Sequence, residues 1–273
     1  MKKGCIGFFL RPKDSQEGGA LSCAIASAEK CGFSHKIVMA RTDYDSTVEN
    51  NEFDGGDVDF IVAIGGDGTI LRAASTAVRN SLPVLGVNTG RIGFLSEIDI
   101  TMLDEAFLKL KNGEYTLDEK LMLECSVDGG QKRICLNDVM LYKERFSGVT
   151  QIDLEVDGKC AGKLSGDGLV VATPTGATGY SISAGGPVVA PGLDVMLITP
   201  ICQHSLTMRP IVTSMHSNIK FTMQSDGFLS LDGMFCETLE KGSEIVVGAY
   251  SERAKFVTLG EKNLFTLIKN KLS

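Results

Sequence analysis

An apolar run ends in a glycine-rich turn that carries one carboxylate. Residues Ile61–Ile64 are apolar, Gly65-Gly-Asp-Gly68 follows, and helical spacing begins at Thr69. Glycines let the backbone approach a ligand closely, and the first amides of a helix suit a phosphate group. A carboxylate repels phosphates unless it holds Mg²⁺ or contacts a hydroxyl group that is to be phosphorylated. We therefore expect Asp67 to be catalytic, with a phosphate bound along Gly65, Gly66 and Gly68.

The same turn has a purely structural explanation. Asp67 or Thr69 could simply cap the helix that follows. An isolated glycine-rich turn is weak evidence for a binding site. Both explanations stay open on this segment alone.

A second cluster follows the next predicted strand and reads Gly86-Val-Asn88-Thr-Gly-Arg91-Ile-Gly-Phe94-Leu. The carboxyl ends of neighbouring parallel strands line one crevice, so both clusters should meet the same ligand. We expect Asn88 to hydrogen-bond the ligand and Arg91 to contact a phosphate. Phe94 could offer a flat face to a base, or it could pack in the core.

A third cluster, residues 166–186, combines glycines with hydroxyl side chains, and the chain has no charged residue from Leu169 to Leu193. Backbone amides and hydroxyl groups suit a sugar, an amide or the edge of a base. Pro174, Pro187 and Pro191 argue against a lipid-exposed helix here. The alternative is a structural corner of a sheet.

These clusters need elements to position them, and the first hundred residues alternate between strand and helix patterns. Strands are predicted at 5–10, 35–39, 58–64 and 83–87, and helices at 19–30, 69–79 and 104–112. This alternation favours a Rossmann-like, doubly wound α/β sheet.

The pattern then changes to short alternating runs. Asp-Gly pairs at 128–129 and 157–158 lie between apolar runs, which indicates β-hairpins. We expect an α/β domain at 1–115 and a predominantly β domain at 116–255. Residues 256–273, with helical spacing from Asn263 to Leu272, are expected to return to the first domain.

Composition excludes several classes of protein. The formal net charge is −7 without a basic block, so we expect no nucleic-acid partner. The 8 cysteines form no C-x-x-C pair, which argues against zinc and disulfide frameworks. Arg11 and Lys13 interrupt the first apolar run too early for a signal peptide. We expect a cytoplasmic chain without a membrane partner.

Taken together, the clusters resemble the NAD kinase family. Gly65-Gly-Asp-Gly-Thr69 alone is shared with phosphofructokinases and diacylglycerol kinases. The resemblance extends from about Ile61 to Pro210 through Asn88-Thr-Gly-x-x-Gly-Phe-Leu95, Asn137-Asp138, Asp167-Gly168 and Thr173-Pro-Thr-Gly-x-Thr-x-Tyr-Ser181. It implies a first domain like those of these kinases. It also implies Mg²⁺-dependent transfer of the ATP γ-phosphoryl group to the 2′-hydroxyl of the adenosine ribose of NAD, giving NADP and ADP.

The resemblance also implies roles for single residues. Asp67 would take the proton of the 2′-hydroxyl or hold the metal, and no other residue is assigned to a metal. Asn137 and Asp138 would read the adenine edge or the ribose, although similar enzymes usually carry Glu at position 138. The residues expected at the adenine end are Thr178, Gly179, Tyr180 and Ser183, with Asp167 expected at the nicotinamide end. The resemblance also implies assembly as a homodimer or homotetramer.

Two other functions stay possible. A lipid or small-alcohol kinase could share the Gly65–Gly68 turn, but the uncharged third cluster favours a soluble polar acceptor. A non-catalytic dinucleotide sensor would not need the Asp67 carboxylate, which this sequence has.

Overall fold

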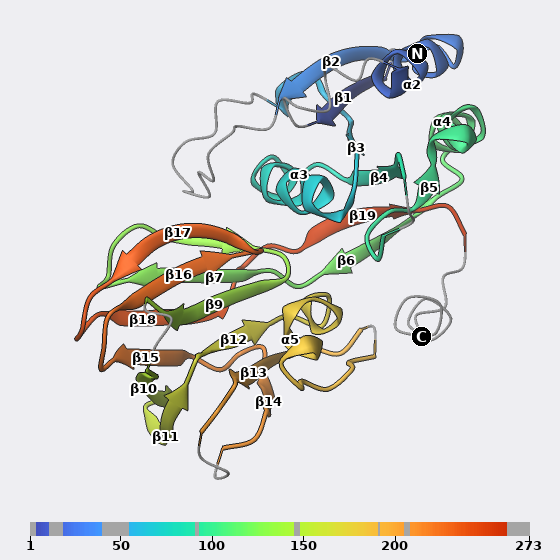
Figure 1. Ribbon diagram of the computed structural model, residues 1–273. Coiled ribbons are helices and arrows are strands. Elements are labelled where there is room, and N and C mark those ends of the chain that lie inside the picture. Colours follow the sequence, from blue (N-terminus) through green and yellow to red (C-terminus); the bar gives the residue numbers. More distant parts are fainter. Residues whose placement is uncertain are drawn as a thin grey trace. The chain divides into compact units, whose positions relative to one another are not determined.

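The computed structural model describes residues 4–10, 19–39, 55–90, 93–144, 148–190, 192–204 and 208–260. These residues form two compact units (Figure 1). The first unit comprises the described residues up to Lys120 and again from Arg253, and the second runs from Leu121 to Glu252.

The first unit is built on a seven-stranded sheet in the order β2-β1-β3-β4-β19-β6, with β5 pairing with β4. All neighbours are parallel except β19 and β6. The strands are β1 (Cys5–Leu10), β2 (Ser34–Met39), β3 (Phe60–Ile64), β4 (Val84–Asn88), β5 (Ile98–Asp99), β6 (Thr116–Lys120) and β19 (Ala254–Thr258). The helices are α2 (Gly19–Lys30), α3 (Asp67–Arg79) and α4 (Leu103–Asn112), with 3-10 turns η1 (Gly55–Asp57) and η2 (Ile100–Met102).

Helices cover both faces of this sheet, as a doubly wound fold requires. Phe60, Val62 and Ile64 of β3 share one apolar cluster with buried residues of α2 and α4. Successive side chains of a strand point to opposite faces. Helix α3 contacts β3, β4 and β19, and its buried residues, such as Ile70, lie outside that cluster. Helix α3 therefore covers the opposite face, and the predicted α/β class is confirmed.

The first sheet is completed by the far end of the chain. Strand β19 lies beside β6, as the red and green strands of Figure 1 show, and pairs with β4 through Phe256 and Val84. Because β6 pairs with β19, the first unit extends to Lys120, a few residues beyond the expected boundary at 115. The helix expected at 263–272 lies outside the described residues.

The second unit contains two six-stranded antiparallel sheets, so its predicted β character is confirmed. One has the order β11-β10-β15-β18-β7-β8 and the other β14-β13-β12-β9-β16-β17. Contacts of β7 with β9, of β10 with β12 and of β11 with β13 join the two sheets. The elements are β7 (Leu123–Val127), β8 (Arg133–Cys135), β9 (Asp138–Lys143), β10 (Thr150–Val156), β11 (Lys159–Gly166), β12 (Gly168–Ala172), η3 (Gly176–Thr178), α5 (Tyr180–Ser183), β13 (Val195–Ile201), β14 (Ile211–Ser214), β15 (Ile219–Met223), β16 (Gly227–Leu231), β17 (Met234–Leu239) and β18 (Glu244–Ala249).

Asp-Gly turns connect three of the hairpins. The predicted hairpins at Asp128 and Asp157 are confirmed, since β7 pairs with β8 and β10 with β11. A third turn at Asp232-Gly233 joins β16 and β17. The three aspartates have φ values of 49°, 52° and 49°, and each is followed by a glycine with positive φ. Positive φ at both central residues is the hallmark of the type I′ hairpin turn.

No helix in the described part of the chain is both long and apolar enough to cross a membrane.

Candidate functional site

The N-terminus of α3 presents the predicted Gly65–Gly68 turn. Gly66 is the N-cap residue, with φ −81° and ψ 179°, and no side chain of the described residues caps the helix. The alternative in which Asp67 or Thr69 serves as the cap is therefore wrong for this structure. The buried Thr69 hydroxyl has no hydrogen-bond partner among the described residues. The helix end is thus left without side-chain capping, as a phosphate site requires.

The Asp67 carboxylate is fixed by the second cluster. Its Oδ2 accepts a hydrogen bond from the Phe94 N–H at 2.8 Å, and its Oδ1 accepts one from the Leu95 N–H at 3.2 Å. A Cβ atom at Gly93 would lie 1.7 Å from Asp67 Oδ1, so only glycine leaves room for the carboxylate in this position. The loop after β4 therefore orients the carboxylate of the first cluster.

The three glycines of the turn differ in what the fold demands of them. Gly65 has φ 148°, and a Cβ there would lie 2.6 Å from Thr69 Oγ1, so the fold itself requires glycine. A Cβ at Gly66 or Gly68 would meet no atom of the described residues within 4 Å, and neither residue has positive φ. Open space beside these two positions is what close approach of a ligand to the backbone requires.

The other predicted residues of the second cluster have different surroundings. Asn88 is 2% exposed, and its side-chain amide donates to the Gly90 carbonyl, so it shapes the loop. The Phe94 side chain is half-buried. Arg91 lies outside the described residues. Ligand contacts by these three residues stay predictions.

The donor set at α3 fits a magnesium ion that arrives with a nucleotide. Within the described ranges, no group of three or more His, Cys, Asp or Glu side chains could hold a metal. Mg²⁺ usually keeps several waters and binds one or two carboxylates together with substrate phosphates. Asp67, which is half-buried at an open helix end, provides one such carboxylate.

In the second unit, the start of β9 and the turn before α5 bring another set of predicted residues together, which we call the β9–α5 cluster. The Asp138 carboxylate accepts a hydrogen bond from the Tyr180 backbone N–H. A Cβ at Gly179 would lie 3.5 Å from Asn137 Nδ2 and 3.6 Å from Asp138 Oδ2. Gly176 packs directly on the Asn137 backbone, since a Cβ there would lie 2.0 Å from the Asn137 carbonyl oxygen. The structure therefore brings Asn137, Asp138, Gly179 and Tyr180 together.

Several groups of this cluster can still meet a ligand. The Asn137 Oδ1 atom is buried and has no hydrogen-bond partner among the described residues. A buried acceptor without a partner is costly, and a ligand donor would satisfy it. Tyr180 is 47% exposed, and Ser183 is exposed at the end of α5. The Thr178 hydroxyl already donates to the Thr175 carbonyl at 3.1 Å.

Asp138 also lies near a second carboxylate, Asp232. Burial, together with the smaller effect of the Asp232 charge, raises the pKa of Asp138 to about 7, against the lowering effect of the Tyr180 N–H. Burial likewise raises the pKa of Asp232 to about 6, against the lowering effect of three backbone N–H donors. Since Asp232 accepts more hydrogen bonds, it is the member of the pair that ionises first.

Asp167 is not part of this cluster. It follows β11 and precedes β12, where Gly168 pairs with Tyr142, whereas Ala172 at the other end of β12 pairs with Asp138. At about 3.4 Å per residue, the two ends of β12 are about 14 Å apart. Asp167 Oδ1 lies 2.6 Å from Lys143 Nζ, and this contact lowers the pKa of Asp167. The structure therefore separates the residue expected at the nicotinamide end from those expected at the adenine end.

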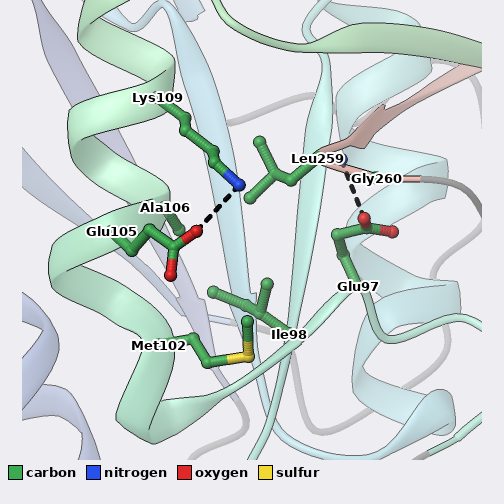
Figure 2. A pocket seen from close by; sticks show the side chains of 8 residues that line it. All are labelled: Glu97, Ile98, Met102, Glu105, Ala106, Lys109, Leu259 and Gly260. Atoms are coloured by element: carbon green, nitrogen blue, oxygen red, sulfur yellow. Dashed lines mark hydrogen bonds and ion pairs between the residues drawn. The ribbon is translucent and has the colours of Figure 1, made fainter.

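A cavity of about 230 Å³ in the first unit lies between α4, β5 and the end of β19 (Figure 2). The charged side chains that line the cavity pair with one another or with the backbone. Lys109 Nζ lies 2.8 Å from Glu105, and Glu97 accepts a hydrogen bond from the Leu259 N–H at 2.8 Å. None of the described site residues lines this cavity.

Sequence reasoning missed two contributors to these clusters. Gly93 appeared only as part of a motif, and its contact with Asp67 joins two loops that no local pattern connects. Asp232 was not singled out, although the Asp-Gly pair at 232–233 carries the same hairpin signal as those at 128 and 157. That signal would have predicted the turn but not the contacts of the carboxylate.

Two family models match the chain. The model of the ATP-NAD kinase N-terminal domain matches residues 17–115, and that of the ATP-NAD kinase C-terminal domain matches residues 136–259. Similar proteins include the NAD kinase of Geotalea daltonii, 38% identical over 78% of this chain and 78% of that protein. The NAD kinase of Desulforamulus reducens is 38% identical over 80% of this chain and 78% of that protein.

Solved structures agree with these matches. Yeast NADH kinase complexed with NADH has a TM-score of 0.85 and 26% identity, covering 99% of this chain and 87% of that one. An NAD kinase from Archaeoglobus fulgidus in complex with ATP has a TM-score of 0.74 at 24% identity, covering 97% and 98%, and shows the same fold. From its two matching domains and its relatives, this chain belongs to the ATP-NAD kinase family.

Proposed function

We propose that this chain transfers the γ-phosphoryl group of ATP to the 2′-hydroxyl of the adenosine ribose of NAD, giving NADP and ADP. The observation that carries the proposal is the Asp67 carboxylate, held by the Phe94 and Leu95 amides at the uncapped N-terminus of α3. Phosphoryl transfer depends on positioning and charge neutralisation, and this arrangement supports both.

The phosphates of the nucleotide would bind along the Gly65–Gly68 turn. The helix end supplies N–H groups and positive partial charge. The open space beside Gly66 and Gly68 supports close approach of a phosphate to the backbone. Because the net charge of the chain is −7, phosphate binding depends on these local groups and not on overall attraction.

Asp67 would act on the acceptor hydroxyl. A carboxylate oriented by two N–H donors can hold the 2′-hydroxyl in line for attack and accept its proton. A bound Mg²⁺ would neutralise the charge of the phosphate oxygens, with Asp67 as its protein ligand if the carboxylate faces the metal. Proton acceptance and metal binding are alternative roles for this one side chain.

The adenosine of NAD would bind at Asn137 and Asp138. The unpartnered Asn137 Oδ1 suits a donor such as the adenine amino group or a ribose hydroxyl. The exposed Tyr180 ring can stack on the base, and Ser183 lies at the same turn. Because the Tyr180 N–H binds the Asp138 carboxylate, the shorter side chain at 138 is supported by the backbone of the turn that carries the ring.

The remaining roles extend this proposal. Asp167 would bind the nicotinamide end of a dinucleotide. Arg91 would contact a phosphate, Asn88 would hydrogen-bond the ligand, and Phe94 would offer a flat face to a base. We further propose that the enzyme requires Mg²⁺, works in the cytoplasm without nucleic-acid or membrane partners, and assembles as a homodimer or homotetramer.

The test is direct. The purified chain is incubated with ATP, Mg²⁺ and NAD, and NADP is read with an NADP-specific dehydrogenase. We expect NADP well above a heat-inactivated control. No NADP in that assay, combined with phosphorylation of diacylglycerol in a parallel assay, would replace the proposal with a lipid kinase. Absence of both products with retained NAD binding would indicate a dinucleotide sensor.

A further inference from the structure

We propose that Asp232 is a positioning residue of the NAD site, which holds the Leu136–Asp138 backbone so that Asn137 and Asp138 face the dinucleotide. The inference rests on the proposed function, because it assigns a task to a residue that acts through the proposed NAD contacts.

The carboxylate of Asp232 collects three successive backbone amides. Its Oδ2 accepts from the Leu136 N–H at 3.0 Å, and its Oδ1 accepts from the N–H groups of Asn137 at 2.7 Å and Asp138 at 3.2 Å. In the reverse direction, the Asp232 N–H donates to the Asp138 carbonyl at 2.9 Å. Hydrogen bonds to a charged acceptor are stronger than neutral ones. Asp232 therefore fixes the backbone on both sides of Asn137.

The other Asp-Gly turns show what a turn alone needs. Among the described residues, the Asp128 carboxylate accepts one bond, from the Glu244 N–H at 2.7 Å, and the Asp157 carboxylate accepts one, from the Asn218 N–H at 2.8 Å. Both aspartates are exposed, whereas Asp232 is partly buried. All three have positive φ, which Asn also tolerates. The additional bonds at Asp232 therefore serve the Leu136–Asp138 segment and not the turn.

Burying the Asp232 and Asp138 carboxyls side by side is unfavourable, which supports a specific task for Asp232. Placing Asp232 beside Asp138 puts two carboxyls where burial raises both pKa values. The neighbouring thiols of Cys135 and Cys236 also have raised pKa values because of burial, so they stay neutral at neutral pH. The Arg133 guanidinium is paired with Glu237. An amide at 232 would remove the repulsion, but it has only one acceptor oxygen and would turn an NH₂ group toward a backbone N–H.

Asp232→Asn in the full chain tests the inference, with Asp157→Asn as the matched control, because it makes the same change at an equivalent turn. We expect Asp232→Asn to raise the KM for NAD about tenfold or more, while kcat and the KM for ATP change by less than about threefold. Asp157→Asn should leave all three constants unchanged.

The pH profile provides a second readout that a loss of stability alone would not move. The KM for NAD of the wild-type chain should rise as pH falls through the titration of Asp138. In Asp232→Asn this rise in KM should begin at lower pH, because the negative charge beside Asp138 is gone. In Asp157→Asn the rise in KM should occur at the same pH as in the wild type.

The outcomes separate the two proposals. If the wild type makes no NADP, the proposed function fails. If the wild type is active but Asp232→Asn matches Asp157→Asn in KM and pH profile, the positioning role is wrong while the function stands. If Asp232→Asn is insoluble, Asp232→Ser, which keeps one acceptor, replaces it. Failure of both to fold while Asp157→Asn folds would assign Asp232 to the fold alone and overturn the inference.

Discussion

Gly93 leaves the space that the Asp67 carboxylate occupies, since a Cβ atom at position 93 would lie 1.7 Å from Asp67 Oδ1. Gly93→Ala should therefore displace the carboxylate from the Phe94 and Leu95 amides. Misplacement of a catalytic group by 1 Å can cost about a hundredfold in rate, and we expect a loss in kcat of that order. Steady-state kinetics will measure it.

Gly19→Ala is the control for this change, because a Cβ at Gly19 would meet no atom within 4 Å in the part of the chain that the structure describes, and the residue starts α2 in the same unit. A Gly93→Ala enzyme with the kcat of Gly19→Ala would contradict the proposed coupling.

Asp67→Asn should lower kcat by about three orders of magnitude, because general acid-base catalysis contributes about 10²–10⁴-fold. The affinity for NAD should change little, since the proposed adenosine contacts lie in the other unit. Binding is measured by calorimetry and turnover by the dehydrogenase-coupled assay. Unchanged turnover with weaker binding would move Asp67 from catalysis to binding.

Tyr180→Ala should raise the KM for NAD about tenfold and leave that for ATP nearly unchanged, because stacking of a base on an aromatic ring contributes about 1–3 kcal/mol. The variant keeps the backbone N–H that Asp138 accepts, so the effect reports the ring alone. Val212→Ala, at an exposed apolar residue of the same unit, is the control. Equal increases in both KM values would remove Tyr180 from the adenosine site.

The contribution of Asp138 and Asp232 to the free energy of unfolding should fall as pH rises from about 5 to 7.5. A carboxyl with a raised pKa in the folded chain binds its proton more tightly there than in the unfolded chain, where the pKa is about 3.9. Its stabilising contribution is complete below that value and is lost as pH passes through about 6 for Asp232 and about 7 for Asp138.

Asp138→Asn removes part of this dependence. The melting temperature of the variant minus that of the wild type should increase with pH over this range, by about 2–4 °C for each kcal/mol of restored stability. Carboxyls with lowered pKa, such as Asp99 and Asp104, have the opposite dependence but contribute equally to both proteins. A constant difference across the range would show that Asp138 titrates normally.

Removal of divalent metal by EDTA should abolish NADP formation, and added Mg²⁺ should restore it. In the described part of the chain, no cluster of side chains could hold a metal without the nucleotide. NAD binding should persist in EDTA, because Asn137 and Asp138 contact the adenosine directly in our proposal. Activity that survives complete chelation would rule out the metal requirement.

The sequence predicted local structure more fully than it predicted contacts. The α/β order of the first unit and two hairpins followed from periodicity and Asp-Gly pairs, because these signals depend on neighbouring residues. The family resemblance, and not residue spacing, predicted that Asn137, Asp138 and Tyr180 lie together. The contacts of Asp232 with Leu136–Asp138 and of Asp67 with Phe94 link distant segments, so no local pattern reveals them. The loop-shaping bond of Asn88 was also unforeseen, because a buried amide and a ligand-binding amide look the same in sequence.

Strand β19 belongs to the first sheet but is synthesised after the second unit. It lies between β4 and β6, yet it follows the entire second unit in the chain. While a ribosome is still making the second unit, β4 and β6 of the first sheet therefore lack their shared neighbour. The second unit, which is continuous from Leu121 to Glu252, can close earlier than the unit that precedes it. Strand pairings between residues this distant in sequence form slowly. We therefore expect the first unit, which would bind phosphate, to complete its fold last.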